Sequence, residues 1–319
     1  MKAIRIHEFG DTSVLKFEES PSLTPKAGQV LVRLKAIGIN PVDIYIRAGH
    51  YAPRTFPFIL GLDGAGLVEA IGPDVSLTKV GDRVYVHGSL SGTYAEQTLC
   101  EATQVHPLPD TVSFEWGAAI GVPYFTAQYA LAIRGQARRG EMVLIHGASG
   151  GVGTAALQIS RTLGLKIIGT AGSEQGRAHI KREGAQYVFD HKAPDYLDQI
   201  MKVTEGRGVD LILEMLANVN LGKDLKILAK FGRVVVIGSR GPCEMDPRDT
   251  MSRNASILGM SIFNATPEDV RAGHAALASG LKQGILKPRI GNQFPLAQAA
   301  DAHAAALEPG TKGKIILIP

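Results

Sequence analysis

The chain has 319 residues, enough for about two domains of roughly 150 residues, each able to bury an apolar core. Hydrophobic residues make up 45% and charged residues 20%, which excludes a disordered chain, and the two cysteines, Cys100 and Cys243, exclude a disulfide framework or a four-cysteine zinc cluster. The net charge of +4 suits an anionic ligand, whereas no basic run of five or more residues points to nucleic acid.

The first 125 residues predict an irregular β domain. Residues 1–7 alternate polar and apolar side chains, which is typical of a strand rather than of an export signal. Short β-branched segments at 30–34 and 83–86 predict further strands between turns rich in glycine and proline. One helix is expected to begin with Asn40 as its N-cap and Pro41 in its first turn. No apolar run approaches the roughly 20 residues that span a bilayer, so we expect a cytoplasmic protein with no membrane partner.

After residue 125, strand-length and helix-length segments alternate, which is typical of a doubly wound α/β domain with a parallel sheet. The predicted α/β domain covers residues 126–260. The β domain covers residues 1–125 and is completed by 261–319, where a helix at 297–307 and a strand at 314–318 are expected. The strands expected in the α/β domain are almost wholly apolar and lie at 142–146, 166–171, 187–189, 211–214, 234–238 and 256–260.

A glycine-rich turn between the strand at 142–146 and the next helix is the most informative motif. Gly150 and Gly151 would let backbone N–H groups approach a pyrophosphate, and the positive end of the helix would face that charge. Gly153 would let helix and strand pack closely, while Ala148 stands where the first glycine of the usual fingerprint lies. The alternative is a tight turn without a ligand, but the βαβ context favours dinucleotide binding.

The end of the next strand bears on the choice between NADH and NADPH. An NAD enzyme usually carries an acid there for the ribose 2′-hydroxyl, whereas this chain reads Ala171-Gly172-Ser173. Ser173 and Arg177 could bind a 2′-phosphate, so NADPH is favoured over NADH. Glu174 argues in the other direction, and Arg177 could equally be a solvated helix charge.

Six segments spread along the whole chain resemble the zeta-crystallin type of quinone oxidoreductase, a zinc-free branch of the medium-chain dehydrogenase/reductase superfamily. The resemblance implies a GroES-like β domain, a Rossmann NADP-binding domain and an active site where the two meet. It also implies a homo-oligomer, either a dimer or a tetramer, that covers the edge strand at 256–262. The segments that carry it are 38–43, 117–126, 146–153, 214–221, 236–241 and 246–251.

The chain departs from the zinc-dependent relatives at both positions of their catalytic zinc motifs. Those relatives carry a cysteine where this chain has Asn40, and a Gly-His-Glu motif where it has Gly61-Leu62-Asp63. The sulfur and imidazole ligands of a catalytic zinc are therefore missing, and we expect no metal. Without a Lewis acid to activate an alcohol, reduction of an electron-poor quinone is the better chemistry.

The resemblance also implies which residues bind NADP(H). The pyrophosphate would be held by Ser149, Gly150, Gly151 and Val152, and Gly172 and Ser173 would border the adenosine ribose and its 2′-phosphate. His191 and Asn220 would line the same groove. The nicotinamide end would lie beside the backbone of Ile237, Gly238, Ser239 and Arg240 and the strand of Met260, Ser261 and Ile262, with Thr126 and Tyr45 on the other wall.

Three residues are expected on the substrate side, each with a structural alternative. Asn40 could contact cofactor or substrate, or serve only as an N-cap. Tyr45 and Tyr51 could hydrogen-bond a quinone oxygen, or only pack. His191, on the cofactor side, would without the resemblance be taken as structural. No residue is assigned as a catalytic acid or base, since solvent could supply the proton.

The sequence thus predicts an NADPH-dependent quinone reductase, with transfer of a hydride or of single electrons in sequence. A second hypothesis is a reductase of enals or enones, which would use the same cofactor. A third is a non-enzymatic protein that binds a nucleotide or RNA, although RNA-binding aromatic motifs and a basic stripe are absent from the sequence.

Overall fold

A computed structural model of the chain describes residues 1–51, 54–308 and 313–319. It divides into two compact units, one of Met1–Pro123 with His274–Pro319, the other of Tyr124–Gly273. The boundaries predicted from the sequence are 125/126 and 260/261. None of the helices in the described part of the chain is long and apolar enough to cross a membrane.

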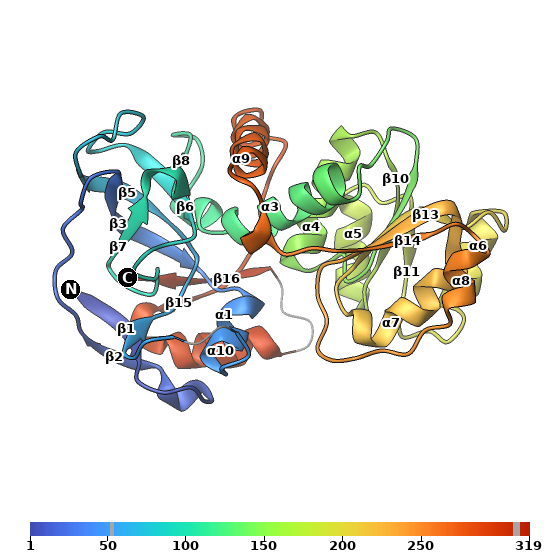
Figure 1. The fold of residues 1–319 in the computed structure, drawn as a ribbon, viewed down its shortest axis with the longest axis horizontal. Coiled ribbons are helices and arrows are strands. Elements are labelled where there is room, and N and C mark those ends of the chain that lie inside the picture. The colour runs from blue at the N-terminus through green and yellow to red at the C-terminus, as the bar shows by residue number, and fades with distance from the viewer. Residues whose placement is uncertain (52–53, 309–312) are drawn as a thin grey trace. The chain divides into compact units, whose positions relative to one another are not determined.

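The first unit is built mainly from antiparallel strands, as expected for a GroES-like fold (Figure 1). One sheet has the order β2-β1-β4, and a seven-stranded sheet has the order β15-β16-β3-β5-β6-β8 with β7 paired to β3. The strands are β1 Lys2–Ile6, β2 Lys16–Glu19, β3 Gln29–Gly38, β4 Phe58–Ile59, β5 Asp63–Ile71, β6 Arg83–His87, β7 Gln97–Glu101, β8 Val105–Pro107, β15 Ile290–Pro295 and β16 Lys314–Ile318.

The C-terminal segment completes the core of this unit. Ala302 of helix α10, Ala299–Leu307, and Leu317 of β16 lie in the same buried cluster as Ile4 and Val32. Because these apolar side chains come from both ends of the chain, the first unit closes only when the C-terminal segment is in place. Helices α1 Pro41–Arg47 and α2 Phe114–Gly117 also belong to this unit.

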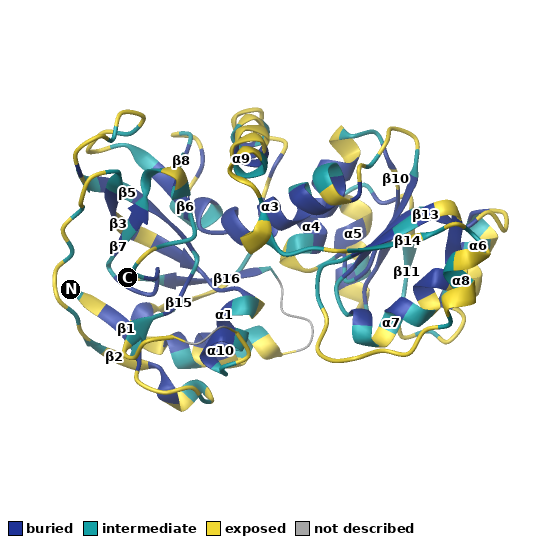
Figure 2. Cartoon of the chain, in the orientation of Figure 1, coloured by how far each residue is buried: buried dark blue, intermediate teal, exposed yellow. Residues whose placement is uncertain are grey.

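The second unit has a six-stranded parallel sheet with helices packed on both sides (Figure 1). The strand order is β11-β10-β9-β12-β13-β14, the doubly wound arrangement that the sequence predicts. Its inner strands are mostly buried, which explains their continuous apolar runs (Figure 2). The elements are α3 Gly121–Gln128, which begins at the unit boundary, β9 Met142–Ile145, α4 Gly151–Thr162, β10 Lys166–Thr170, α5 Glu174–Arg182, β11 Tyr187–Phe189, α6 Tyr196–Val203, β12 Val209–Glu214, α7 Ala217–Asp224, β13 Leu228–Val236, α8 Pro247–Met251 and β14 Ser256–Gly259.

The structure differs from the sequence analysis around residue 260. The strand predicted at 256–260 ends at Gly259, and residues Ile262–Asn264 form a 3₁₀ turn. Helix α9, Pro267–Lys282, follows and was not predicted. The first turns of α9 belong to the second unit, because Gly273 packs directly on Phe125: a Cβ there would lie 2.6 Å from the Phe125 ring.

Candidate functional site

The glycine turn lies at the carboxyl end of β9, where parallel strands of doubly wound sheets present their ligands. Gly147 has a φ of +56°, a conformation that favours glycine. Gly150 is the N-cap of α4, and its N–H donates to the Gly147 carbonyl at 3.0 Å. The first turn of α4 contains no acidic residue, so the positive end of a 12-residue helix is available to an anion.

Close packing of α4 on the sheet depends on Gly153. A Cβ added at this position would lie 2.5 Å from the Cα of Ala148 and 2.6 Å from the Gly147 oxygen. Both neighbours are backbone atoms and cannot rotate away. The prediction that a glycine is needed here for helix and strand to approach each other is therefore supported by the geometry.

The end of β10 lies beside the glycine turn. Ala171 and Gly172 follow the strand, and Ser173 is the N-cap of α5, accepting a hydrogen bond from the Gly176 N–H at 3.1 Å. A Cβ on Gly172 would lie 2.7 Å from His191 Nε2 and 2.8 Å from Lys192 Cε. The structure therefore brings His191, expected from the resemblance, together with Gly172. It adds Lys192, which sequence reasoning missed.

Arg177 is only partly available to a ligand. Its Nη1 donates to Asp190 Oδ2 at 2.7 Å and to the Ala171 carbonyl at 3.4 Å. The Lys192 N–H and then the Arg177 charge hold the pKa of Asp190 below its usual value. The cationic group beside Gly172 thus consists of Arg177, held by Asp190, and the exposed Lys192.

Three further expected segments lie at the same edge of the sheet. Asn220 donates from its side chain to Glu214 Oε1 at 3.1 Å, just beyond the end of β12. The Ile237 and Gly238 N–H groups donate to the Glu214 carbonyl at 2.9 and 3.3 Å. Ser239 and Arg240 follow and are exposed. Met260 lies after β14 and donates its N–H to the Val236 carbonyl at 3.2 Å, with Ser261 and Ile262 next in the chain.

Within the second unit, the last expected residue is Thr126, on α3. Its side chain is buried, with 5% of the residue exposed. The loops that follow β9, β10, β12, β13 and β14 are therefore gathered at the carboxyl edge of the sheet, while Thr126 lies on a helix before β9.

In the first unit, Asn40 is the N-cap of α1, as the sequence predicts. Its backbone N–H donates to Asp43 Oδ2 at 2.8 Å, and its side chain makes no capping hydrogen bond. Instead Asn40 Nδ2 donates to Asp63 Oδ2 at 2.9 Å, and Asn40 Oδ1 accepts a hydrogen bond from Lys314 Nζ. The predicted N-cap position is confirmed, while these buried partners engage both ends of the side-chain amide.

Lys314 brings a buried positive charge to the two positions at which the zinc-dependent relatives have ligands. Its Nζ lies 3.1 Å from Asp63 Oδ2, and both side chains are buried. Asp63 Oδ1 accepts a further hydrogen bond from the Val122 N–H at 2.8 Å. Sequence reasoning missed Lys314, because it is separated from Asp63 by 251 residues and joins it only through the pairing of β16 with β3.

The two tyrosines expected near the substrate lie close together at the end of α1. Tyr45 is half-buried within the helix, and Tyr51 follows it with 46% of its surface exposed. Burial raises the pKa of Tyr51, and the neighbouring Tyr45 raises it further. The Tyr51 hydroxyl therefore stays protonated near neutral pH and can donate a hydrogen bond.

Two family profiles match the chain, one described as an alcohol dehydrogenase GroES-like domain over residues 26–110 and one as a zinc-binding dehydrogenase over residues 151–279. Human quinone oxidoreductase is 47% identical over 321 residues, covering 100% of this chain and 98% of that protein. Among solved structures, the Escherichia coli quinone oxidoreductase complexed with NADPH has a TM-score of 0.92 at 29% identity and covers 100% of both chains. A 2-haloacrylate reductase has a TM-score of 0.87 at 28% identity, covering 100% of this chain and 99% of that one.

Proposed function

Because the chain belongs to the quinone oxidoreductase family of the medium-chain dehydrogenase/reductase superfamily, we propose that it reduces quinones with NADPH. The observation that carries this proposal is the glycine turn at the start of α4. The next strand, β10, ends at Ala171-Gly172-Ser173, without the acid that binds the ribose 2′-hydroxyl in NAD enzymes. NADPH, when bound, supplies the hydride or single electrons that a quinone accepts. The protein binds and orients both molecules and excludes water.

Each group along the carboxyl edge of the sheet has a part in this proposal. Ser149, Gly150, Gly151 and Val152 would hold the pyrophosphate at the start of α4. Gly172, Ser173, Arg177, Lys192 and His191 would surround the adenosine ribose and its 2′-phosphate, whose charge suits the two cations. Asn220, Ile237, Gly238, Ser239, Arg240, Met260, Ser261 and Ile262, with Thr126 and Tyr45, would face the nicotinamide end.

The reaction we propose is independent of zinc. The Lys314 ammonium, bound to Asn40 and Asp63, supports this, since a divalent cation at these two side chains would meet a fixed positive charge. We assign Asn40 the task of holding Lys314. The proposed quinone contacts are then Tyr45 and Tyr51, whose phenols can donate to a quinone oxygen.

Reduction of an activated alkene is the second candidate. It is favoured by the similarity to a 2-haloacrylate reductase, a protein whose name indicates reduction of a haloacrylate, at almost the same structural agreement. Both candidates need the same cofactor site, so the residues described above do not separate them.

A panel of electron acceptors at fixed NADPH concentration tests the proposal. We expect NADPH oxidation with 9,10-phenanthrenequinone and none with enals, enones or 2-haloacrylates. Activity confined to the alkenes would replace the first candidate by the second. No turnover with any acceptor, together with RNA binding that persists at moderate salt in a filter assay, would favour a non-enzymatic role.

Arg177 gives a test of cofactor choice. The substitution Arg177→Ala is expected to lower kcat/KM for NADPH roughly tenfold or more, because one charge-assisted hydrogen bond to the 2′-phosphate is lost. It should leave kcat/KM for NADH nearly unchanged. Arg182→Ala, an exposed cation at the other end of α5, is the matched control and should affect neither. Equal losses with the two cofactors would mean that Arg177 acts only through its pairing with Asp190.

A further inference from the structure

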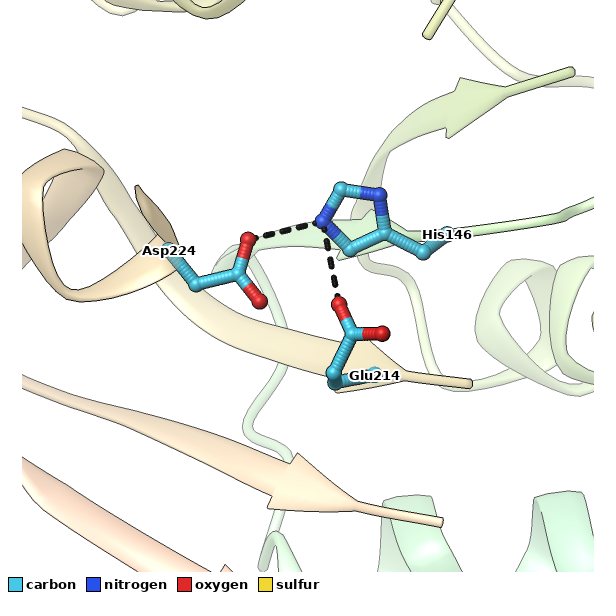
Figure 3. A group of neighbouring side chains, drawn as sticks. All are labelled: His146, Glu214 and Asp224. Carbon is cyan, nitrogen blue, oxygen red and sulfur yellow. Dashed lines mark hydrogen bonds and ion pairs between the residues drawn. The ribbon is translucent and has the colours of Figure 1, made fainter. Parts of the chain in front are cut away.

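Three buried ionisable side chains meet beneath the loops to which we assign the cofactor. His146 follows β9, Glu214 ends β12 and Asp224 ends α7, and the three side chains point toward one another (Figure 3). One nitrogen or oxygen atom of each lies within 4.8 Å of the others. The function proposed above uses none of them.

Hydrogen bonds fix the protonation of the imidazole. His146 Nε2 lies 2.8 Å from Asp224 Oδ1 and 3.4 Å from Glu214 Oε2, so it donates to Asp224. Nδ1, at 3.5 Å from the Thr170 hydroxyl, is then the acceptor of that O–H. This assignment follows from the network, in which Asp224 Oδ1 faces His146 as an acceptor.

The two carboxyls need a proton between them. Glu214 Oε2 and Asp224 Oδ2 are buried and find no separate donor in residues 1–51, 54–308 and 313–319. One oxygen of each carboxyl lies within 4.8 Å of the other, and two ionised carboxylates buried this close together would repel each other. Burial raises the pKa of each carboxyl to about 7, whereas burial lowers the pKa of His146 and keeps it neutral. The proton therefore belongs to the Glu214 and Asp224 pair.

The cluster is hydrogen-bonded to three of the loops at the cofactor edge. Glu214 Oε1 accepts from the Leu216 N–H and from Asn220, and the Glu214 carbonyl accepts from Ile237 and Gly238. On the other side, the Thr170 oxygen that faces His146 accepts from the Gly147 N–H at 3.3 Å. The loops after β9 and β12 are thus bonded to the side chains of the cluster, and the loop after β13 is bonded to the backbone of Glu214.

We propose that His146, Glu214 and Asp224 share a buried proton that holds these three loops in the arrangement that binds NADPH. The inference rests on the proposed function and makes the three side chains positioning residues. Since the pKa of the carboxyls is raised, the proton is held below about pH 7 and released as the pH rises through that value. Two adjacent buried charges then repel each other and loosen the loops.

Three other titratable groups face the cluster. The Tyr196 ring of α6 lies edge-on to His146, with centroids 6.4 Å apart. Burial, and then the two acidic neighbours, raise the pKa of Tyr196 to about 12, so it does not titrate in this range. Lys223 on α7 lowers the pKa of Asp224. Burial, and then His146, lower the pKa of His191 in the loop after β11. Lys223 and His191 are present in both the wild type and the Asp224 variant. Their own effects on NADPH affinity therefore cancel when the two proteins are compared.

The substitution Asp224→Asn tests the inference. The amide can accept from His146 and donate to Glu214, so it reproduces a protonated Asp224 that cannot lose its proton. We expect wild type and variant to bind NADPH equally at about pH 6, and the wild type to bind about tenfold more weakly than the variant at about pH 8. Infrared difference spectra should show a protonated carboxylic acid in the wild type that titrates near pH 7 and is lost or shifted in the variant. Glu214→Gln is the second variant, with the same expectation should Asp224→Asn fail to fold.

Asp198→Asn, an exposed acid on α6, is the control and should follow the wild type at every pH. The inference would be overturned if the ratio of NADPH affinities between the wild type and Asp224→Asn did not change with pH. A wild-type spectrum without a titrating carboxylic acid, or a stoichiometric divalent metal in the purified protein, would also overturn it. If the wild type binds NADPH at no pH, the proposed function fails instead. The infrared band then still decides whether the proton is shared.

Discussion

Replacing Asp63 with alanine is expected to lower the free energy of unfolding of the first unit by about 3–5 kcal/mol, one of the largest effects of any single substitution in this chain. Asp63 is fully buried and accepts hydrogen bonds from Lys314, Asn40 and the Val122 N–H. Its removal leaves the buried Lys314 ammonium without its ion-pair partner and the Val122 N–H without an acceptor.

The measurement is denaturant unfolding followed by fluorescence of Trp116, the single tryptophan, which lies on α2 in the first unit. Combining Asp63→Ala with Lys314→Met should restore part of the loss, because the uncompensated charge is then gone. A loss below about 1 kcal/mol for Asp63→Ala, the range of exposed ion pairs, would contradict the buried arrangement.

The second large effect is expected at Gly153. Alanine is the better helix former by about 1 kcal/mol, so Gly153→Ala would stabilise an isolated α4. In the folded unit its Cβ would meet the backbone of Ala148 at 2.5 Å, and α4 must move away from the sheet. We expect a loss of about 1–3 kcal/mol in stability and at least a tenfold loss in NADPH affinity, measured by titration of cofactor fluorescence.

Gly259→Ala is the matched control, since a Cβ at Gly259 would contact nothing within 4 Å. It should leave NADPH affinity unchanged. If Gly153→Ala binds NADPH as tightly as the wild type, the close approach of α4 to the sheet is not required for binding, and the assignment of the pyrophosphate to this turn is wrong.

The sheet of the second unit could be predicted from the sequence because local signals agree there. Strands at 142–146, 166–171 and 187–189 stand out as apolar runs, and glycines mark the turn into α4. Helix α9 could have been predicted in the same way. Thr266 and Asp269 form a reciprocal cap at its start, and Val270, His274, Leu277 and Leu281 recur at helical spacing. Its position also explains why the unit boundary is at 273/274 rather than at 260/261.

The buried polar clusters could not be predicted, because their members are far apart in sequence. His146 and Asp224 are separated by 78 residues, and Asn40 and Lys314 by 274. Each of these residues alone resembles an ordinary cap, strand end or surface charge. Asn40 illustrates the limit: its N-cap position could be predicted, but the two partners that turn its side chain away from the helix could not.

The most direct test of the proposed function is a steady-state comparison of kcat/KM for NADPH and NADH with 9,10-phenanthrenequinone as acceptor. The segment Ala171-Gly172-Ser173, to which we assign the adenosine ribose, carries no acid, and Arg177 and Lys192 lie beside it. We therefore expect turnover with a strong preference for NADPH. A preference for NADH would mean that an acid such as Glu174 binds the ribose. Absence of quinone turnover with either cofactor would contradict the proposed function.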